Sequence, residues 1–289
     1  MIRNRFVLGP ALSLLLAAGT MLPAHADIVL PRISPKASVM QTIGTTDLTV
    51  TYSRPGVKGR EIWGKLVPYD APWRTGANEA TTFTTTTDIT VGGQNLPAGT
   101  YSFFTLPKAG DWSVVFSKQK DLWGAYEYDP KQDAARVTLK PTPAESVEWM
   151  RFTFDNLTQN SGDLVLRWEK LELKVPIAID VDGIVMKNVR TDLAAAKPDD
   201  WRTRLRAAQY TFDSGLHMDE GAKWLDESIA IQQGYSNLGL KARWLAKEGK
   251  TTEAVTTAKK AIEIGKAAKE PVNTTQMETL VAEWTGEKK

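Results

Sequence analysis

The feature that most constrains the fold is a series of short segments in which apolar and polar residues alternate. In residues 46–53, for example, Leu48, Val50 and Tyr52 alternate with threonines, the period of a half-buried strand. Turns rich in Gly and Pro separate these segments, and no helical pattern interrupts them before residue 182. Such a series is typical of antiparallel sheets rather than of βαβ units. We therefore expect residues 27–182 to form an antiparallel β-sandwich or barrel.

The expected strands cover residues 38–43, 46–53, 80–87, 88–91, 101–106, 112–117, 134–139, 147–154 and 163–177. The first two form a hairpin around Gly44. In the last strand the apolar parity changes, since Leu166 and Trp168 share one face and Leu171 and Leu173 share the other. This change predicts a β-bulge near Glu169.

Residues 1–26 have the features of a signal peptide. Arg3 and Arg5 precede an apolar run over residues 6–18, and residues 24–26 read Ala-His-Ala, a cleavage signal. The apolar run is too short for a comfortable membrane span. We expect a periplasmic or secreted protein that begins near Asp27 and has no membrane span after cleavage.

Charge and composition narrow the function classes. The chain has 36 basic and 34 acidic side chains, and loss of the leader with its two arginines would make it formally neutral. A neutral chain argues against a nucleic-acid partner. The chain has no Cys and two His, of which His25 lies in the leader. A Cys nucleophile and a His- or Cys-rich zinc site within the chain are thereby excluded. We expect no metal and no cofactor, and interpret His217 as a helix-flanking polar residue rather than a general base.

The composition changes after residue 182. We expect a linker over residues 183–199 and a helical domain over residues 200–289. Helical patterns cover residues 201–212, 219–233, 237–247, 252–269 and 274–284, with Asp199 and Asp200 capping the first. Turns separate these helical patterns in pairs, which predicts antiparallel helical hairpins that resemble tetratricopeptide units. Because each hairpin needs a neighbour to cover its apolar stripe, we expect the tail to dock on the β domain or on a protein partner.

The segment 68–83, PYDAPWRTGANEATTF, is the strongest candidate for a functional site. It begins as a proline-containing loop, ends as a strand, and carries Trp73, Arg74, Asn78 and Glu79 between them. These are a large apolar plane and three strongly hydrogen-bonding groups. The alternative is structural, with Arg74 and Glu79 forming an ion pair and Trp73 buried in the core.

Two further loops carry similar side chains. Residues 54–64 contribute Arg54 and Arg60, which can clamp a ligand or instead bond loop carbonyls. Residues 121–136 contribute Trp123 and Tyr126 among several carboxylates. A calcium site in that second loop is disfavoured, because its acidic residues lack the glycine and the ligand alternation of a known calcium loop.

Four motifs resemble the bacterial domain of unknown function family 2911. They are SPKASVMQTIGTTDLTVTYSRPGVKGR, VPYDAPWRTGANEATTF, LPAGTYSFFTLP and DLWGAYEYDPKQDAARV, in this order between about residues 31 and 177. The helical tail resembles the tail found on many members. The resemblance implies the domain limits and export, but no reaction. Its motifs coincide with the loops described above, which favours one pocket lined by Arg54, Arg60, Trp73, Arg74, Asn78, Glu79, Trp123 and Tyr126.

Three hypotheses of function follow. In the first, the β domain binds a small polar ligand, such as a glycan or a peptide fragment, and the tail docks on a partner protein. In the second, the protein is a hydrolase or isomerase in which Glu79 is the general acid or base and Arg74 sets its protonation. In the third, the chain is an envelope scaffold without a small ligand.

The signal peptide gives the first testable expectation. Intact mass spectrometry of the exported protein should give the mass of a chain that begins near Asp27, because the Ala-His-Ala segment is a cleavage signal. A mass that includes Met1 would contradict it.

Overall fold

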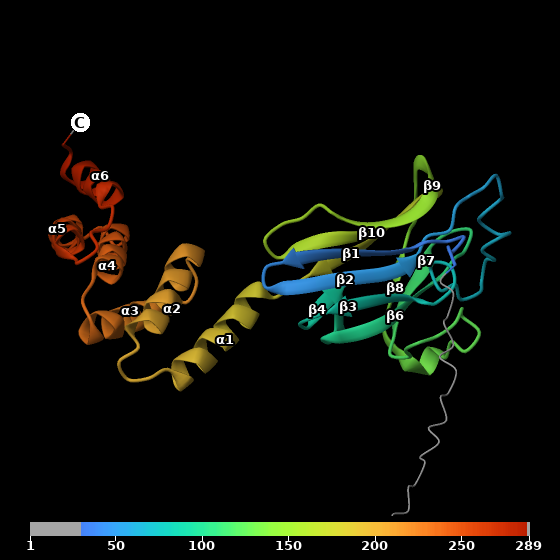
Figure 1. Ribbon diagram of the computed structural model, residues 1–289, viewed down its shortest axis with the longest axis horizontal. Coiled ribbons are helices and arrows are strands. Elements are labelled where there is room, and N and C mark those ends of the chain that lie inside the picture. The colour runs from blue at the N-terminus through green and yellow to red at the C-terminus, as the bar shows by residue number, and fades with distance from the viewer. Residues whose placement is uncertain (1–29, 288–289) are drawn as a thin grey trace, which may run out of the picture.

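The computed structural model describes residues 30–287, so the expected signal peptide lies outside the described residues. The strands form two antiparallel sheets, as expected for a sandwich (Figure 1). The six-stranded sheet contains, in spatial order, β1 (Lys36–Ile43), β2 (Thr46–Ser53), β3 (Thr81–Thr85), β6 (Gly99–Leu106), β7 (Trp112–Ser117) and β8 (Asp133–Leu139). The four-stranded sheet contains β5 (Gln94–Leu96), β4 (Ile89–Val91), β10 (Ser161–Ala178) and β9 (Thr142–Asp155).

The strands follow the alternation of the sequence closely. In β2 the side chains of Leu48, Val50 and Tyr52 are buried between the sheets, whereas the intervening residues face outward. The register between β9 and β10 shifts on both sides of Glu169, whose φ of +56° marks the predicted bulge. Sequence analysis missed the short strand β5, which it placed in a loop.

The core lies between the two sheets and contains the aromatic rings of Phe83, Phe103, Phe116 and Phe152. A smaller apolar cluster lies on the outer face of the six-stranded sheet, where Leu122 from the loop after β7 covers Phe104. This loop therefore folds back over the sheet instead of extending into solvent, which brings residues 121–128 close to the end of β3.

Four indole rings, the tryptophan cluster, pack together at the end of the sandwich. They belong to Trp63, Trp73, Trp112 and Trp168. The edge of Trp63 meets the other three rings at centroid distances of 4.9–5.8 Å, and Trp73 stacks on Trp168 at 5.7 Å with an interplanar angle of 22°. Edge-to-face and offset-stacked pairs are the favourable geometries of aromatic rings. The cluster thereby fixes the long connection between β2 and β3, which carries Trp63 and Trp73, to β7 and β10.

Six helices follow the sheets: α1 (Val181–Ala195), α2 (Trp201–Ser214), α3 (Met218–Ile231), α4 (Tyr235–Lys247), α5 (Thr251–Ala267) and α6 (Thr275–Thr285). The segment expected as a linker is thus largely the helix α1. The predicted cap of α2 is confirmed, since the Asp200 carboxylate accepts hydrogen bonds from the backbone N–H groups of Arg202 and Thr203. In residues 30–287, each helix is too short or too polar to cross a bilayer.

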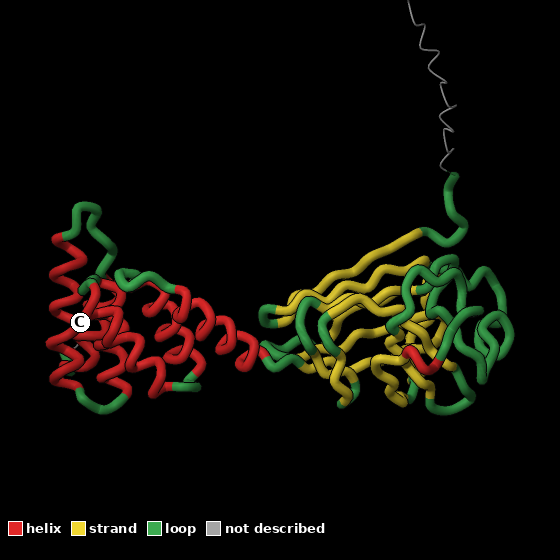
Figure 2. Tube along the Cα trace, turned by 90° about the horizontal axis from the view of Figure 1, so that it is seen from below, coloured by secondary structure: helices red, strands yellow, loops and turns green. Residues whose placement is uncertain are grey.

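The helix α1 joins the β domain to the other helices. Val181 and Ile184 in its first turn pack against the sandwich core. Its Asp182 accepts hydrogen bonds from Tyr210 and His217, so His217 connects α1 with the start of α3. Figures 1 and 2 show α2–α6 extending away from the sheets. We expected the tail to dock on the β domain or on a partner protein. The helices α2–α6 do not dock on the β domain, and docking on a partner remains a prediction.

The hairpin turn between β1 and β2 allows a test of how α1 is attached. Gly44 has φ +58°, and a Cβ atom there would lie 2.4 Å from Cγ2 of Val181. We expect Gly44→Ala to cost about 1–2 kcal/mol of unfolding free energy for the left-handed backbone, and more for the clash with α1. Gly93→Ala is the matched control, because Gly93 has φ +85° with open space around it.

Urea unfolding of both variants measures the difference. Adding Val181→Ala to Gly44→Ala should recover the part of the loss that comes from the clash. Equal losses for Gly44→Ala and Gly93→Ala would show that α1 does not rest on this turn.

Candidate functional site

The loops that carry the candidate residues meet through a short backbone ladder. The N–H of Ala80 donates to the carbonyl of Leu122 at 2.9 Å, and the N–H of Gly124 donates to the carbonyl of Asn78 at 3.3 Å. Asn78 has φ +58°, a left-handed conformation that Asn tolerates better than most residues. The two loops are therefore adjacent along this ladder, which we call the 78–124 ladder.

The 78–124 ladder separates two cavities. One, the Arg74 cavity, has a volume of about 640 Å³ and is lined on the loop side by residues 72–77 and by Ala125 and Tyr126. The other, the Ser102 cavity, has a volume of about 300 Å³ and is lined by residues 79–80, 121–123 and by strands of the six-stranded sheet. Both volumes lie in or close to the range of small-molecule sites.

The eight candidate residues are consequently divided. Arg60, Trp73, Arg74 and Tyr126 line the Arg74 cavity, and Glu79 and Trp123 line the Ser102 cavity. Arg54 and Asn78 line neither. Their side chains bond the main chain instead, Arg54 Nε donating to the carbonyl of Met150 at 2.8 Å and Asn78 Nδ2 to that of Ser34 at 3.3 Å.

Arg74 is half-buried, and its guanidinium has no partner. It forms no ion pair and no side-chain hydrogen bond with residues 30–287, and its Nε is fully buried. Burial lowers the pKa of Arg74 from its ordinary value, while the neighbouring Tyr126 opposes that shift. Because buried charges in proteins are normally paired, this guanidinium is available to a ligand.

The surroundings of Arg74 carry positive charge and apolar surface. Lys58 and Arg60 also line the cavity, and no carboxylate of the described residues does. The guanidinium of Arg60 is already engaged, since its Nε and Nη2 donate to the carbonyls of Val57 and Gly56 at 3.1 and 2.6 Å. Trp168 lines the same wall, and its indole N–H is buried without a partner in residues 30–287. The cavity is thus lined by the unpaired guanidinium of Arg74 and by the stacked rings of Trp73 and Trp168.

Glu79 is paired, but not with Arg74. Its carboxylate accepts from Arg32 Nη1 at 2.7 and 2.8 Å, and both side chains are about half exposed. The hydrogen bond from Arg32 lowers the pKa of Glu79 below its ordinary value, and the positive charge of Lys36 acts in the same direction. Of the structural alternative, the Arg74–Glu79 ion pair is not formed, because Glu79 pairs with Arg32. Its other part agrees with the structure, since Trp73 is buried in the core.

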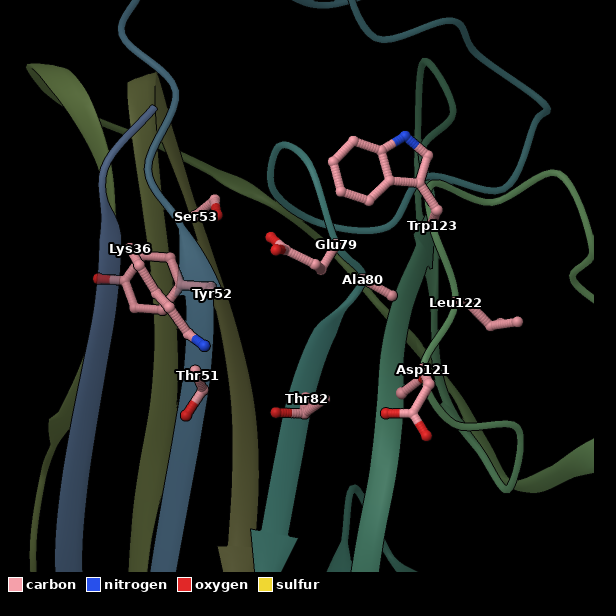
Figure 3. A pocket seen from close by; sticks show the side chains of 11 residues that line it. Lys36, Thr51, Tyr52, Ser53, Glu79, Ala80, Thr82, Asp121, Leu122 and Trp123 are labelled. Carbon is pink, nitrogen blue, oxygen red and sulfur yellow. The ribbon is translucent and has the colours of Figure 1, made fainter. Parts of the chain in front are cut away.

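The Ser102 cavity lies on the outer face of the six-stranded sheet (Figure 3). Lys36 comes from β1, Thr51 and Ser53 from β2, and Thr82 from β3. The loop residues 121–123 form the opposite wall, where the ring of Trp123 is 64% exposed. Glu79 and Trp123 lie at the same end of this cavity (Figure 3).

Two carboxylates of the second loop, those of Asp129 and Asp133, have structural partners. Asp129 Oδ1 accepts from the N–H of Lys131 and caps a short 3₁₀ helix, Pro130–Gln132. Asp133 accepts from Arg136 and from the hydroxyl of Tyr128, whose pKa burial raises to about 12. Across residues 30–287 we find no group of three or more His, Cys, Asp or Glu side chains placed to hold a metal ion.

Several residues of these cavities, among them Trp168 and Ser102, were not identified from the sequence. Trp168 was seen only as a core residue of a strand, although the predicted bulge beside it was a signal of local irregularity. Ser102 lies in the middle of β6 and gave no signal, because hydroxyl residues are common on the outer face of a sheet.

The Arg32–Glu79 pair leads to a prediction about pH. Arg32→Met should raise the pKa of Glu79 toward its ordinary value, because the main cause of the lowered pKa is removed. The lowered folded pKa means that the pair stabilises the fold above that ordinary value, and that this stabilisation is lost as the pH falls through the lowered pKa. NMR titration of the side-chain carboxyl carbon measures the change, and Arg206→Met, on an exposed helix position, is the control. An unchanged Glu79 titration in Arg32→Met would refute the pairing.

Comparison with protein families agrees with the extent of the β domain. The profile of a family described as Protein of unknown function (DUF2911) matches residues 34–177, from just before β1 to the end of β10. No curated protein and no solved structure matches the chain. Through its β domain, the chain belongs to the family DUF2911.

Proposed function

We propose that the β domain binds a small polar ligand carrying an anionic group, and that the ligand occupies the Arg74 cavity. The observation that supports this best is the half-buried guanidinium of Arg74, which has no partner among the described residues. An unpaired buried charge is unfavourable, and a carboxylate or phosphate group would satisfy it with two parallel hydrogen bonds.

The walls of the cavity fit the rest of such a ligand. Leu66, Val67 and Pro72 provide apolar surface, and Tyr126, 88% exposed, stands at the solvent side. The stacked rings of Trp73 and Trp168 also line the cavity. An acidic sugar or a peptide fragment with a free carboxylate has the required combination of one charge, polar groups and apolar faces.

The other hypotheses receive less support. A reaction run by Glu79 with Arg74 requires the two groups to act together, whereas they line different cavities and Glu79 is bound to Arg32. A scaffold without a ligand gives no reason for the unpartnered donors in the Arg74 cavity. We further propose that the helical tail docks on a partner protein, and that the chain works in the periplasm or outside the cell.

The test removes the charge but keeps the length of the side chain. Arg74→Met should abolish binding of an anionic ligand while leaving the melting temperature unchanged or higher, because a half-buried unpaired charge is lost. The probes are small mono- and dicarboxylates, uronic acids, phosphate esters, and dipeptides with a free C-terminal carboxylate. Thermal shift identifies the binding probe and isothermal titration calorimetry measures its affinity.

Arg206→Met is the matched control, since Arg206 is exposed on α2 and has no partner among the described residues. It should bind as the parent does. If Arg74→Met unfolds at a clearly lower temperature and the parent binds none of the probes, Arg74 is a structural residue and the proposal fails.

A further inference from the structure

The second cavity contains its own unexplained polar group. The hydroxyl of Ser102 is 1% exposed, lies in the wall of the Ser102 cavity and has no hydrogen-bond partner in the described residues. Leaving a buried hydroxyl without a partner costs on the order of 1–3 kcal/mol. Alanine would fit the same space without this cost, so the hydroxyl does not stabilise the free protein. Its presence therefore indicates a role in binding a ligand.

Ser102 is part of a row of hydroxyl groups that crosses three strands. Thr82 on β3 is paired directly with Ser102 on β6 and with Thr51 on β2, so their side chains share one face of the sheet. The hydroxyl of Thr82 has no partner in residues 30–287, whereas that of Thr51 bonds Ser38 at 3.2 Å. Each hydroxyl can both donate and accept a hydrogen bond. This row forms a polar floor held rigidly by the backbone ladder.

The walls add complementary groups. Lys36 can only donate, Asp121 can only accept, and neither is in an ion pair within the described part of the chain. Trp123 presents a largely open indole face beside them. Donors, acceptors and groups that do both therefore surround one small space next to an aromatic plane.

We propose that the Ser102 cavity binds one neutral sugar ring. Ring hydroxyls both donate and accept, so they can satisfy Ser102, Thr82, Lys36 and Asp121 together. The C–H face of the ring would lie on the indole of Trp123. The volume of about 300 Å³ is at the lower end for small-molecule sites and suits a single ring.

A net anion fits this cavity poorly, because Glu79 and Asp121 line it. A zwitterion, such as a free amino acid, is the competing ligand, since it would place a carboxylate on Lys36 and an ammonium group on Asp121. It would leave the buried row of hydroxyls largely unused, which is why we favour the sugar. The site does not depend on the function proposed for the Arg74 cavity, because the 78–124 ladder separates the two.

The experiment uses the full chain with D-glucose, D-galactose, D-mannose and N-acetyl-D-glucosamine as probes, together with the methyl glycosides. Glycine and alanyl-alanine represent zwitterions. Saturation-transfer NMR detects binding and calorimetry measures it. At least one sugar should bind, and Trp123→Ala should weaken its binding about tenfold or more through loss of the stacking plane.

A methyl glycoside that binds as well as the free sugar would indicate the end of a glycan chain as the natural ligand. A methyl glycoside that does not bind would indicate a free monosaccharide.

Ser102→Ala separates a ligand contact from a structural role. It should weaken sugar binding while keeping or raising the melting temperature of the free protein, because an unpartnered buried hydroxyl is removed. Tyr126→Ala, an exposed aromatic residue of the same loop that lines only the Arg74 cavity, should leave sugar binding unchanged. The proposal is overturned if no sugar binds, if only the zwitterions bind, or if Ser102→Ala and Trp123→Ala bind the sugar as the parent does. Arg74→Met should retain sugar binding, so the two proposals fail separately.

Discussion

The packing of four indole rings holds in place the loop residues that line the Arg74 cavity. Trp63 and Trp73 come from the long connection between β2 and β3, and Trp112 and Trp168 come from opposite sheets. Backbone hydrogen bonds also hold this connection to the strands, among them the reciprocal pair between Trp73 and Thr105 at 2.8 and 3.0 Å. Burial of large aromatic surface adds to these bonds in holding the connection in place. The cluster makes irregular segments rigid enough to position individual side chains.

The position of Arg74 follows from this packing. The ring of Trp73 stacks on Trp168, and its backbone is bridged to Thr105. With Trp73 fixed in the core in this way, the side chain of Arg74 lines the cavity. Trp168 in turn lies beside the bulge at Glu169, where the face of β10 changes. The arrangement leaves the N–H groups of Trp63 and Trp168 without partners in residues 30–287. Buried N–H groups without partners, such as these and Arg74 Nε, are rare in a hydrophobic core and more common at binding sites.

Much of the fold could be read from the sequence, whereas the partners of the site residues could not. A strand with a clear alternation, such as β2, was predicted because its apolar side chains are buried between the sheets and the residues between them face outward. The strand β5 was missed because it has three residues and begins with two polar ones. The separation of Arg74 from Glu79 depends on Arg32, which is 47 residues from Glu79 in the sequence. The 78–124 ladder is likewise a long-range pairing of irregular segments, for which local periodicity gives no signal.

The two cavities differ in the charge of the side chains that line them. Among residues 30–287, the Arg74 cavity is lined by three cationic side chains and no carboxylate, and the Ser102 cavity by two carboxylates and Lys36. A chain that is close to neutral overall thus places its charges unevenly around the two cavities. Salt screens the charges of partly buried groups, such as Arg74 and Glu79, less than those of exposed groups. If the proposals above hold, an anion binds on the side of Arg74, whose guanidinium has no partner in residues 30–287, and is disfavoured on the side of Glu79 and Asp121. On that second side, Ser102 and Thr82 are held by paired strands rather than by loops, so a sugar would be selected by hydrogen-bond geometry instead of charge. Because Arg74 and Glu79 line different cavities, the structure gives no support to a catalytic centre that uses both.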